Sequence, residues 1–181
     1  MKSNVGARAV DLFQLIETNS FSSIWFWLLV AISWSSASRW ILGVPFDLVQ
    51  RALKEGGEAE ERVHTLLRIN VSRLENIQKI AGVIMVGFVS FVLTGFALLG
   101  FYYAIEFFQA LFLLTFPLML VGVINVRTAH RLDEELPTGK ELYRIFRRTR
   151  LMIMFLGMIS IFVTSMWGMF YVISVSSFPG F

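Results

Sequence analysis

The chain has 181 residues, no cysteine, a hydrophobic fraction of 56% and a formal net charge of +3 at pH 7. The lack of cysteine excludes disulfides, thiolate metal ligands and thiol nucleophiles, and the apolar content exceeds that of an ordinary soluble domain. Because most Lys and Arg residues flank apolar stretches, we interpret the basic charge as membrane topology and lipid contact rather than nucleic-acid binding.

Residues 1–20 precede the first long apolar stretch and carry their own pattern. A cleavable secretory signal needs a basic start, an apolar core and a small-residue cleavage site. Here, instead, apolar side chains recur at helical spacing among charged residues. They are Val5, Ala9, Leu12, Phe13 and Ile16. The pattern predicts a short amphipathic helix that lies on the outer surface of a membrane.

Four long stretches with few charges predict four membrane-spanning helices, near residues 22–44, 81–101, 107–126 and 151–173. About 20 apolar residues in a helix cross a hydrocarbon core of about 30 Å. The second and third spans are separated by a few residues around Glu106, which predicts a tight antiparallel hairpin with a hydrated Glu106 at its turn. The expected fold is an all-α integral membrane four-helix bundle. It forms a single membrane domain over residues 1–181, with two helices extended into the cytoplasm.

The distribution of positive charge predicts the orientation of these spans. Of the 16 Lys and Arg residues, all but Lys2 and Arg8 lie at Arg39 or within the polar segments 45–80 and 127–150. Loops rich in Lys and Arg stay on the cytoplasmic side of a membrane. We therefore expect both polar segments in the cytoplasm and both chain termini outside.

The first polar segment, 45–80, contains two predicted helices. One begins at Phe46 and is ended by Gly56 and Gly57, and the other runs from about Glu58 to Gly100. Positions along the second helix alternate in steps of four and three residues, the spacing of a coiled-coil seam. These candidate partner contacts are Val63, Leu67, Asn70, Leu74 and Ile77. Asn70 either sets the register of a helix–helix contact or is a solvated position on a half-exposed helix.

The second polar segment, 127–150, has a helix start signal and a basic cluster. The run from Thr138 to Glu141 matches the capping box, so we expect a helix that begins there and continues into the last span. Four arginines then gather at the membrane edge, where anionic lipid headgroups are the expected partner. They are Arg144, Arg147, Arg148 and Arg150.

Two residues inside the spans are candidates for an intramembrane role. Arg39 lies about one turn inside the inner boundary, where it either extends to the headgroups or acts as a buried functional charge. Pro117 removes a backbone donor in mid-span and frees the carbonyl of Leu113. Such kinks line substrate paths in transporters and also occur in inert bundles.

Small residues repeat with the same spacing in two spans. Gly87, Ser90 and Thr94 in the second span are matched 70 residues later by Gly157, Ser160 and Thr164. The match indicates either an internal duplication or the separate selection of small residues by close helix packing in lipid.

The residues that would indicate an enzyme are missing from the sequence. The two histidines, His64 and His130, have no ligand spacing to another histidine, and no nucleophile–base pair or glycine-rich nucleotide loop is present. We expect no catalytic residues, no metal site and no cofactor.

The sequence resembles a family of small bacterial inner-membrane proteins commonly labelled "component of SufBCD complex". The most specific run is Gly43-Val44-Pro45-Phe46-Asp47, and the likeness covers nearly the whole chain. It is also carried by Ser20-Phe21-Ser22, Trp34-Ser35-Ser36-Ala37-Ser38, Trp40-Ile41-Leu42, Arg68-Ile69-Asn70-Val71 and Trp167-Gly168-Met169. The resemblance implies a bacterial inner-membrane location and an association with the cytosolic iron–sulfur assembly machinery. Without cysteine, this chain lacks the usual ligands of a cluster.

These features predict a non-catalytic accessory or scaffold membrane protein that binds a partner through its cytoplasmic helices. The alternative is a small oligomeric channel or transporter built around Pro117 and the small faces of the second and fourth spans. Expected partners are the lipid bilayer, anionic lipids, a cytoplasmic protein and, for the alternative, further copies of the chain.

Overall fold

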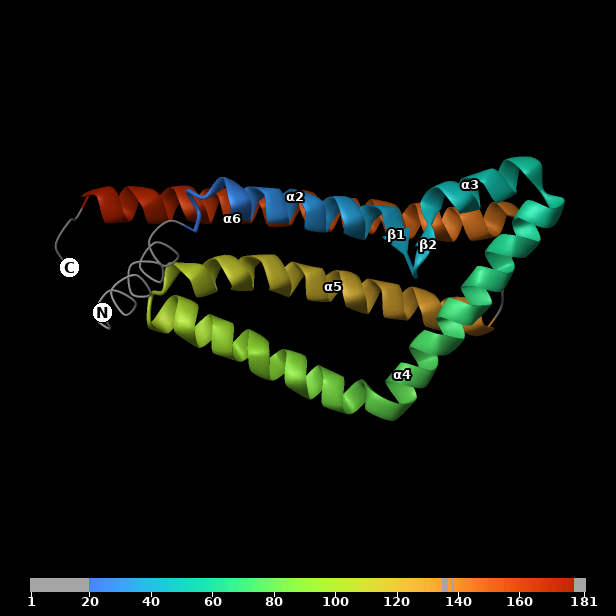
Figure 1. Ribbon diagram of the computed structural model, residues 1–181, viewed down its shortest axis with the longest axis horizontal. Helices are drawn as coiled ribbons and strands as arrows, with labels where there is room; N and C mark the ends of the chain where they lie inside the picture. The colour runs from blue at the N-terminus through green and yellow to red at the C-terminus, as the bar shows by residue number, and fades with distance from the viewer. Residues whose placement is uncertain (1–19, 135–136, 138, 178–181) are drawn as a thin grey trace, which may run out of the picture.

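The computed structural model describes residues 20–134, 137 and 139–177 (Figure 1). The predicted amphipathic helix at residues 1–20 lies almost wholly outside the described residues. The elements in order are α2 (Ile24–Arg39), β1 (Trp40–Ile41), β2 (Val44–Pro45), α3 (Phe46–Glu55), α4 (Gly57–Ala97), the π-helical turn η1 (Leu98–Tyr102), α5 (Glu106–Glu134) and α6 (Gly139–Ser177).

Three of these helices are long and apolar enough to cross a membrane. They cover Gly57–Tyr102, Glu106–Leu132 and Gly139–Ser174. The predicted spans at 81–101, 107–126 and 151–173 lie inside them, and each helix continues into a polar segment. The all-α class and a membrane location are therefore confirmed in this coarser form.

The first predicted span, 22–44, is too long. The helix α2 has 16 residues, ends at Arg39 and is not among the three helices long enough to cross. Strands β1 and β2 follow as a two-residue hairpin in which Ile41 pairs with Val44. Its turn residues Leu42 and Gly43 both have positive φ, 55° and 73°, as this kind of tight turn requires. The apolar side chains of Ile41, Leu42 and Val44 are buried within the protein, so this run resembles a membrane span in sequence without forming one.

The helices form an asymmetric bundle (Figure 1). Helices α2 and α6 run side by side along one edge, α5 lies in the middle, and the apolar half of α4 runs along the opposite edge. Helix α4 bends sharply midway, so that its first half slants across the bundle. We call the end that holds the hairpin, α3 and the first half of α4 the polar end. The opposite end, which holds Tyr102 and the start of α2, is the aromatic end.

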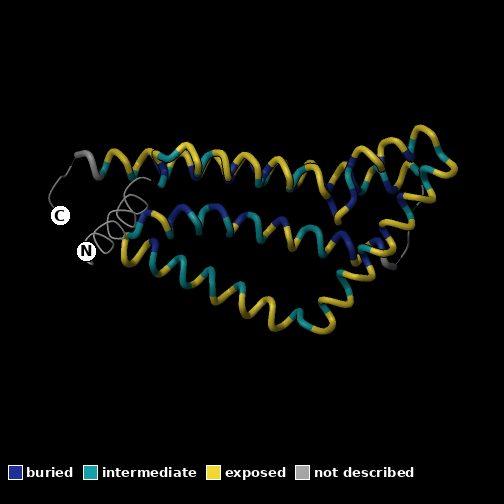
Figure 2. Tube along the Cα trace, viewed as in Figure 1, coloured by how far each residue is buried: buried dark blue, intermediate teal, exposed yellow. Residues whose placement is uncertain are grey.

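Most of the largest buried side chains lie at the polar end. Figure 2 shows the buried residues there and along α5, whereas no residue in the most apolar stretch of α4 is buried. The fully buried set is Phe146, Ile41, Leu67, Leu132, Ile153, Val44, Val49 and Val63. Each such side chain stabilises the fold by about 1.5–3 kcal/mol when removed from water. This core therefore fixes the positions of the helices at the polar end.

Helix α3 and the start of α4 follow the sequence prediction closely. Phe46, Val49 and Ala52 recur at three-residue spacing and form the buried face of α3. Gly56 and Gly57 have φ values of 62° and 52°, which are easily adopted only by glycine, and they separate α3 from α4. The predicted break between the two helices is confirmed.

The expectation of a hydrated Glu106 is wrong. Only 3% of Glu106 is exposed, and its Oε1 accepts a 2.7 Å hydrogen bond from the backbone N–H of Phe21. Nearby, the Gln109 side chain donates to the carbonyl of Gly100 at 2.8 Å. Trp167 Nε1 donates to Gln109 Oε1 at 2.9 Å. The buried Glu106 carboxylate accepts a backbone N–H of the segment that leads into α2. Together these hydrogen bonds connect α2, α5 and α6 at the aromatic end.

Candidate functional site

The predicted seam on α4 packs mostly against this chain itself. Val63 and Leu67 are 2% and 0% exposed and belong to the core of the polar end. Leu74 is partly buried against that core, while Ile77 is 42% exposed. The first positions of the heptad pattern, Val63 and Leu67, therefore pack within the chain. Only the last position, Ile77, is exposed to a partner.

Asn70 contacts the hairpin turn. A Cβ built on Gly43 would lie 3.1 Å from Asn70 Nδ2, so the side-chain amide of Asn70 fills the space that glycine leaves open. The residue is neither deeply buried nor fully exposed. Neither of the two sequence-based alternatives for Asn70 included this contact, because the hairpin was not predicted.

The four arginines of the basic cluster do not share one environment. Arg144, Arg147 and Arg148 are exposed on α6 at the polar end. Arg150 is partly buried, and its Cζ lies 4.5 Å from the centroid of the Phe46 ring. That distance is typical of a cation–π contact, so Arg150 helps to join α6 to α3.

The two intramembrane candidates also have defined places. Arg39 is exposed at the end of α2, where its Nε and Nη2 donate to the backbone carbonyl and hydroxyl of Ser35 at 3.3 and 3.1 Å. Pro117 is buried inside α5, and that helix continues through it. The Thr115 hydroxyl donates to the carbonyl of Leu111 at 2.6 Å, just before the proline.

A surface groove lies between α3 and the first turns of α4. It has a volume of about 290 Å³, and a more open hollow of about 550 Å³ continues from it along α4. We call the two together the α3–α4 groove. Its principal lining residues are Leu48, Arg51, Glu55, Glu58, Arg62 and Leu66. Figure 1 places this region at the extremity of the polar end.

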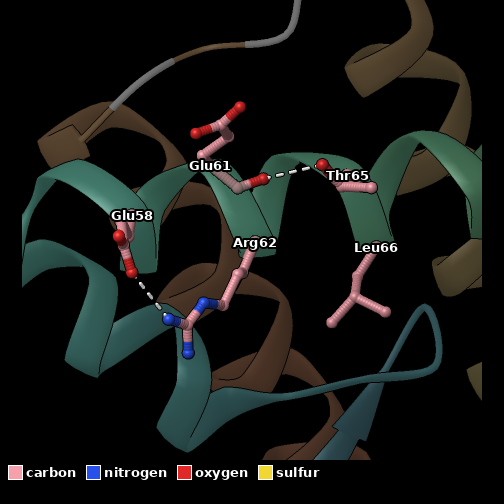
Figure 3. Close-up of a pocket in the computed structure, with 5 residues that line it drawn as sticks. All are labelled: Glu58, Glu61, Arg62, Thr65 and Leu66. Carbon is pink, nitrogen blue, oxygen red and sulfur yellow. Dashed lines mark hydrogen bonds and ion pairs between the residues drawn. The ribbon is translucent and has the colours of Figure 1, made fainter.

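The α3–α4 groove combines exposed leucines with paired charges. Leu48 and Leu66 are 37% and 40% exposed. Arg51 pairs with Glu55 at 3.0 Å, and Arg62 pairs with Glu58 at 2.9 Å. Figure 3 shows Glu58, Arg62 and Leu66 on one side of α4, with Glu61 on the other.

These exposed ion pairs contribute little to stability, and they place both signs of charge around the leucines. An apolar centre with a polar rim is the usual anatomy of a protein–protein interface. The arrangement is therefore suited to polypeptide contact.

The groove rests on a fixed base. Glu60, on α4, accepts a 2.9 Å hydrogen bond from the backbone N–H of Gly139 at the start of α6, and His64 Nε2 lies 3.8 Å from the same carboxylate oxygen. Val63, one turn after Glu60 on α4, belongs to the core of the polar end. This first part of α4 is therefore held both by α6 and by α3, and the groove is preformed.

Sequence reasoning missed Leu48 and Leu66 as surface residues. The pairs Arg51–Glu55 and Glu58–Arg62 have the i,i+4 spacing of exposed helical ion pairs, and this was the available signal. It marks the solvent-facing sides of α3 and α4. It does not show that the two helices fold back to place both leucines in one groove.

The capping box at 138–141 is tested only in part. Thr138 lies outside the described residues, and α6 begins at Gly139 as expected. Among the described residues, no group of three His, Asp or Glu side chains is arranged to hold a metal ion.

No family model, curated protein or solved structure matches this chain.

Proposed function

We propose that this protein is a non-catalytic accessory or scaffold protein of the membrane that binds a protein partner at the α3–α4 groove. The observation that carries this proposal is the pair of exposed leucines, Leu48 and Leu66, set among paired charges on a preformed base. The membrane helices hold this groove at the extremity of the polar end (Figure 1). A partner can approach there without entering the bilayer.

The shape of the groove favours a polypeptide over a small metabolite. Small-molecule sites are concave and bury most of their ligand. The α3–α4 groove is shallow, and its rim carries both signs of charge already paired within the chain. A partner would present an apolar side chain to the leucines, with acidic and basic groups beside it to exchange with Arg62 and Glu58.

We further propose a four-span bacterial inner-membrane protein with both termini outside and the groove in the cytoplasm. The concentration of Lys and Arg at the polar end supports this orientation. Helix α2 would be the fourth membrane segment, since it runs along α6 and buries Val30 and Trp34 (Figure 1). The sequence resemblance supplies the first partner to test, the iron–sulfur assembly complex.

Co-purification from native membranes in a mild detergent tests the docking proposal. The test variant carries Leu48→Ser and Leu66→Ser, which remove the apolar centre and leave the ion pairs in place. The matched control is Ile69→Ser, the same kind of change on α4 at a side chain that is 57% exposed and outside the groove.

We expect a stoichiometric partner with the parent chain and with Ile69→Ser, and a loss of at least tenfold with the double variant. Equal recovery with all three chains would contradict the site. Recovery of the chain only as a homo-oligomer would contradict the accessory function.

A further inference from the structure

A second groove lies between the apolar half of α4 and the second half of α5. It has a volume of about 690 Å³, within the range of about 300–1,000 Å³ that is usual for ligand sites. We call it the α4–α5 groove. Its lining includes Leu42 and Gly43 of the hairpin turn, Val86 and Val89 of α4, and Met119 of α5. It is separate from the α3–α4 groove described above.

Polarity changes along the α4–α5 groove. Val89 and Met119 lie toward the aromatic end, and the walls there are apolar. Gln78 and Asn125 lie toward the polar end, where α4 enters and α5 leaves the apolar region. Arg127, two residues beyond Asn125 on α5, is exposed, whereas Lys79 of α4 pairs with Glu75 at 3.3 Å and lines a different hollow. The site is thus apolar in its depth, amide-lined at its mouth and flanked there by the Arg127 guanidinium. This order matches a phospholipid lying parallel to the helices.

Three details indicate that this groove is suited to a ligand. Asn125 Oδ1 is buried without a hydrogen-bond partner among the described residues, which is costly in apolar surroundings. A Cβ built on Gly122 would have no neighbour within 4 Å, so the wall beside Asn125 is open. In addition, Val83 and Val86 of α4 are 89% and 60% exposed. The groove is therefore an uncovered apolar channel with an unpaired acceptor buried in its wall.

We propose that the α4–α5 groove binds one phospholipid whose headgroup carries a hydrogen-bond donor, either an ethanolamine ammonium or a glycerol hydroxyl. An acyl chain lies along Val86, Val89 and Met119. The headgroup donor satisfies Asn125 Oδ1, and the phosphate lies near Arg127. Phosphatidylcholine has the same chains and phosphate but no headgroup donor, so it provides a direct comparison.

Native mass spectrometry of the full chain in mild detergent tests this site. Phosphatidylethanolamine, phosphatidylglycerol and phosphatidylcholine with identical acyl chains are added in competition. We expect the two lipids with donors to be retained about tenfold better, the effect of one hydrogen bond to a group that is otherwise unsatisfied. Asn125→Leu should remove this preference while the chain still retains lipid.

Filling the groove should remove lipid of every kind. Gly122→Leu places a side chain in the open wall, and Val86→Trp fills the groove independently from α4. Gly87→Leu is the matched control, because Gly87 is exposed on α4 outside the groove and its Cβ would meet nothing within 4 Å. It should retain lipid like the parent chain.

Three results would overturn the proposal. The first is equal retention of phosphatidylcholine by the parent chain. The second is unchanged retention when folded Gly122→Leu and Val86→Trp are both compared with Gly87→Leu. The third is a dimer mass without lipid, which would show that a second copy fills the groove.

Discussion

The indole ring of Trp34 lies directly against Gly157. A Cβ built on Gly157 would come within 2.8 Å of Trp34 Cε3, and Trp34 is itself buried. Gly157→Ala should therefore push α2 away from α6 or force the rigid ring aside. Overpacking of this kind costs about 1–3 kcal/mol. We expect a lower melting temperature of the purified protein in detergent, measured by intrinsic tryptophan fluorescence.

Gly87→Ala is the matched control for that change. Gly87 occupies the corresponding place in the repeated Gly, Ser, Thr spacing, but it is exposed and has no neighbour within 4 Å. Because alanine favours helix over glycine by up to about 1 kcal/mol, this variant should be as stable as the parent or slightly more stable. Equal destabilisation by the two variants would show that the contact with Trp34 is not the cause.

Glu60→Ala should loosen the start of α6. The carboxylate of Glu60 accepts from the Gly139 N–H, one of the donors that a helix start leaves without an intrahelical partner. Loss of such a cap costs about 0.5–2 kcal/mol. Hydrogen exchange should become faster in the first turns of α6, while Glu61→Ala, an exposed neighbour, should leave the exchange rate unchanged. Slow exchange in both variants would rule out the capping role.

Glu106→Ala should destabilise the aromatic end. The change leaves the buried N–H of Phe21 without its acceptor, at a cost of about 1–3 kcal/mol. Glu106→Gln keeps an acceptor oxygen and should lose less. Limited proteolysis near the start of α2 measures the effect, and equal cleavage of parent and Glu106→Ala would show that this hydrogen bond does not hold the chain there.

Single cysteines report the orientation, because the chain has no native thiol. With a membrane-impermeant maleimide, Tyr103→Cys should label in intact cells, since Tyr103 is 65% exposed at the aromatic end. Glu58→Cys should label only after permeabilisation, since the side chain of Glu58 is 87% exposed at the polar end. The reverse result would place the α3–α4 groove outside the cell.

The long helices were predictable because their signals are local. Charged residues bound the apolar stretches at 81–101 and 107–126 on both sides and the stretch at 151–173 at its start. Gly56 and Gly57 separate α3 from α4 through backbone conformation alone. Each of these signals acts within a few residues. None of them depends on which parts of the chain meet in space.

The features that were missed depend on contacts between distant residues. Leu42 lacks the usual turn chemistry, and the apolar run around it resembles a continuing span. Glu106 is buried by Phe21, 85 residues earlier in the chain. The position of Leu66 at the edge of a groove depends on how α3 packs beside Val63 of α4. For the same reason, neither groove could be derived from the sequence.

Helix α4 is one unbroken element from Gly57 to Ala97, and it contributes Leu66 to one groove and Val86 to the other. Both grooves therefore share one helix, and any displacement of α4 by a docked partner would also move a wall of the lipid site more than four turns away. Thermodynamic linkage makes the effect mutual, so the lipid would alter partner affinity by the same factor. The lipid composition of the membrane would then alter the affinity for the partner through the position of α4.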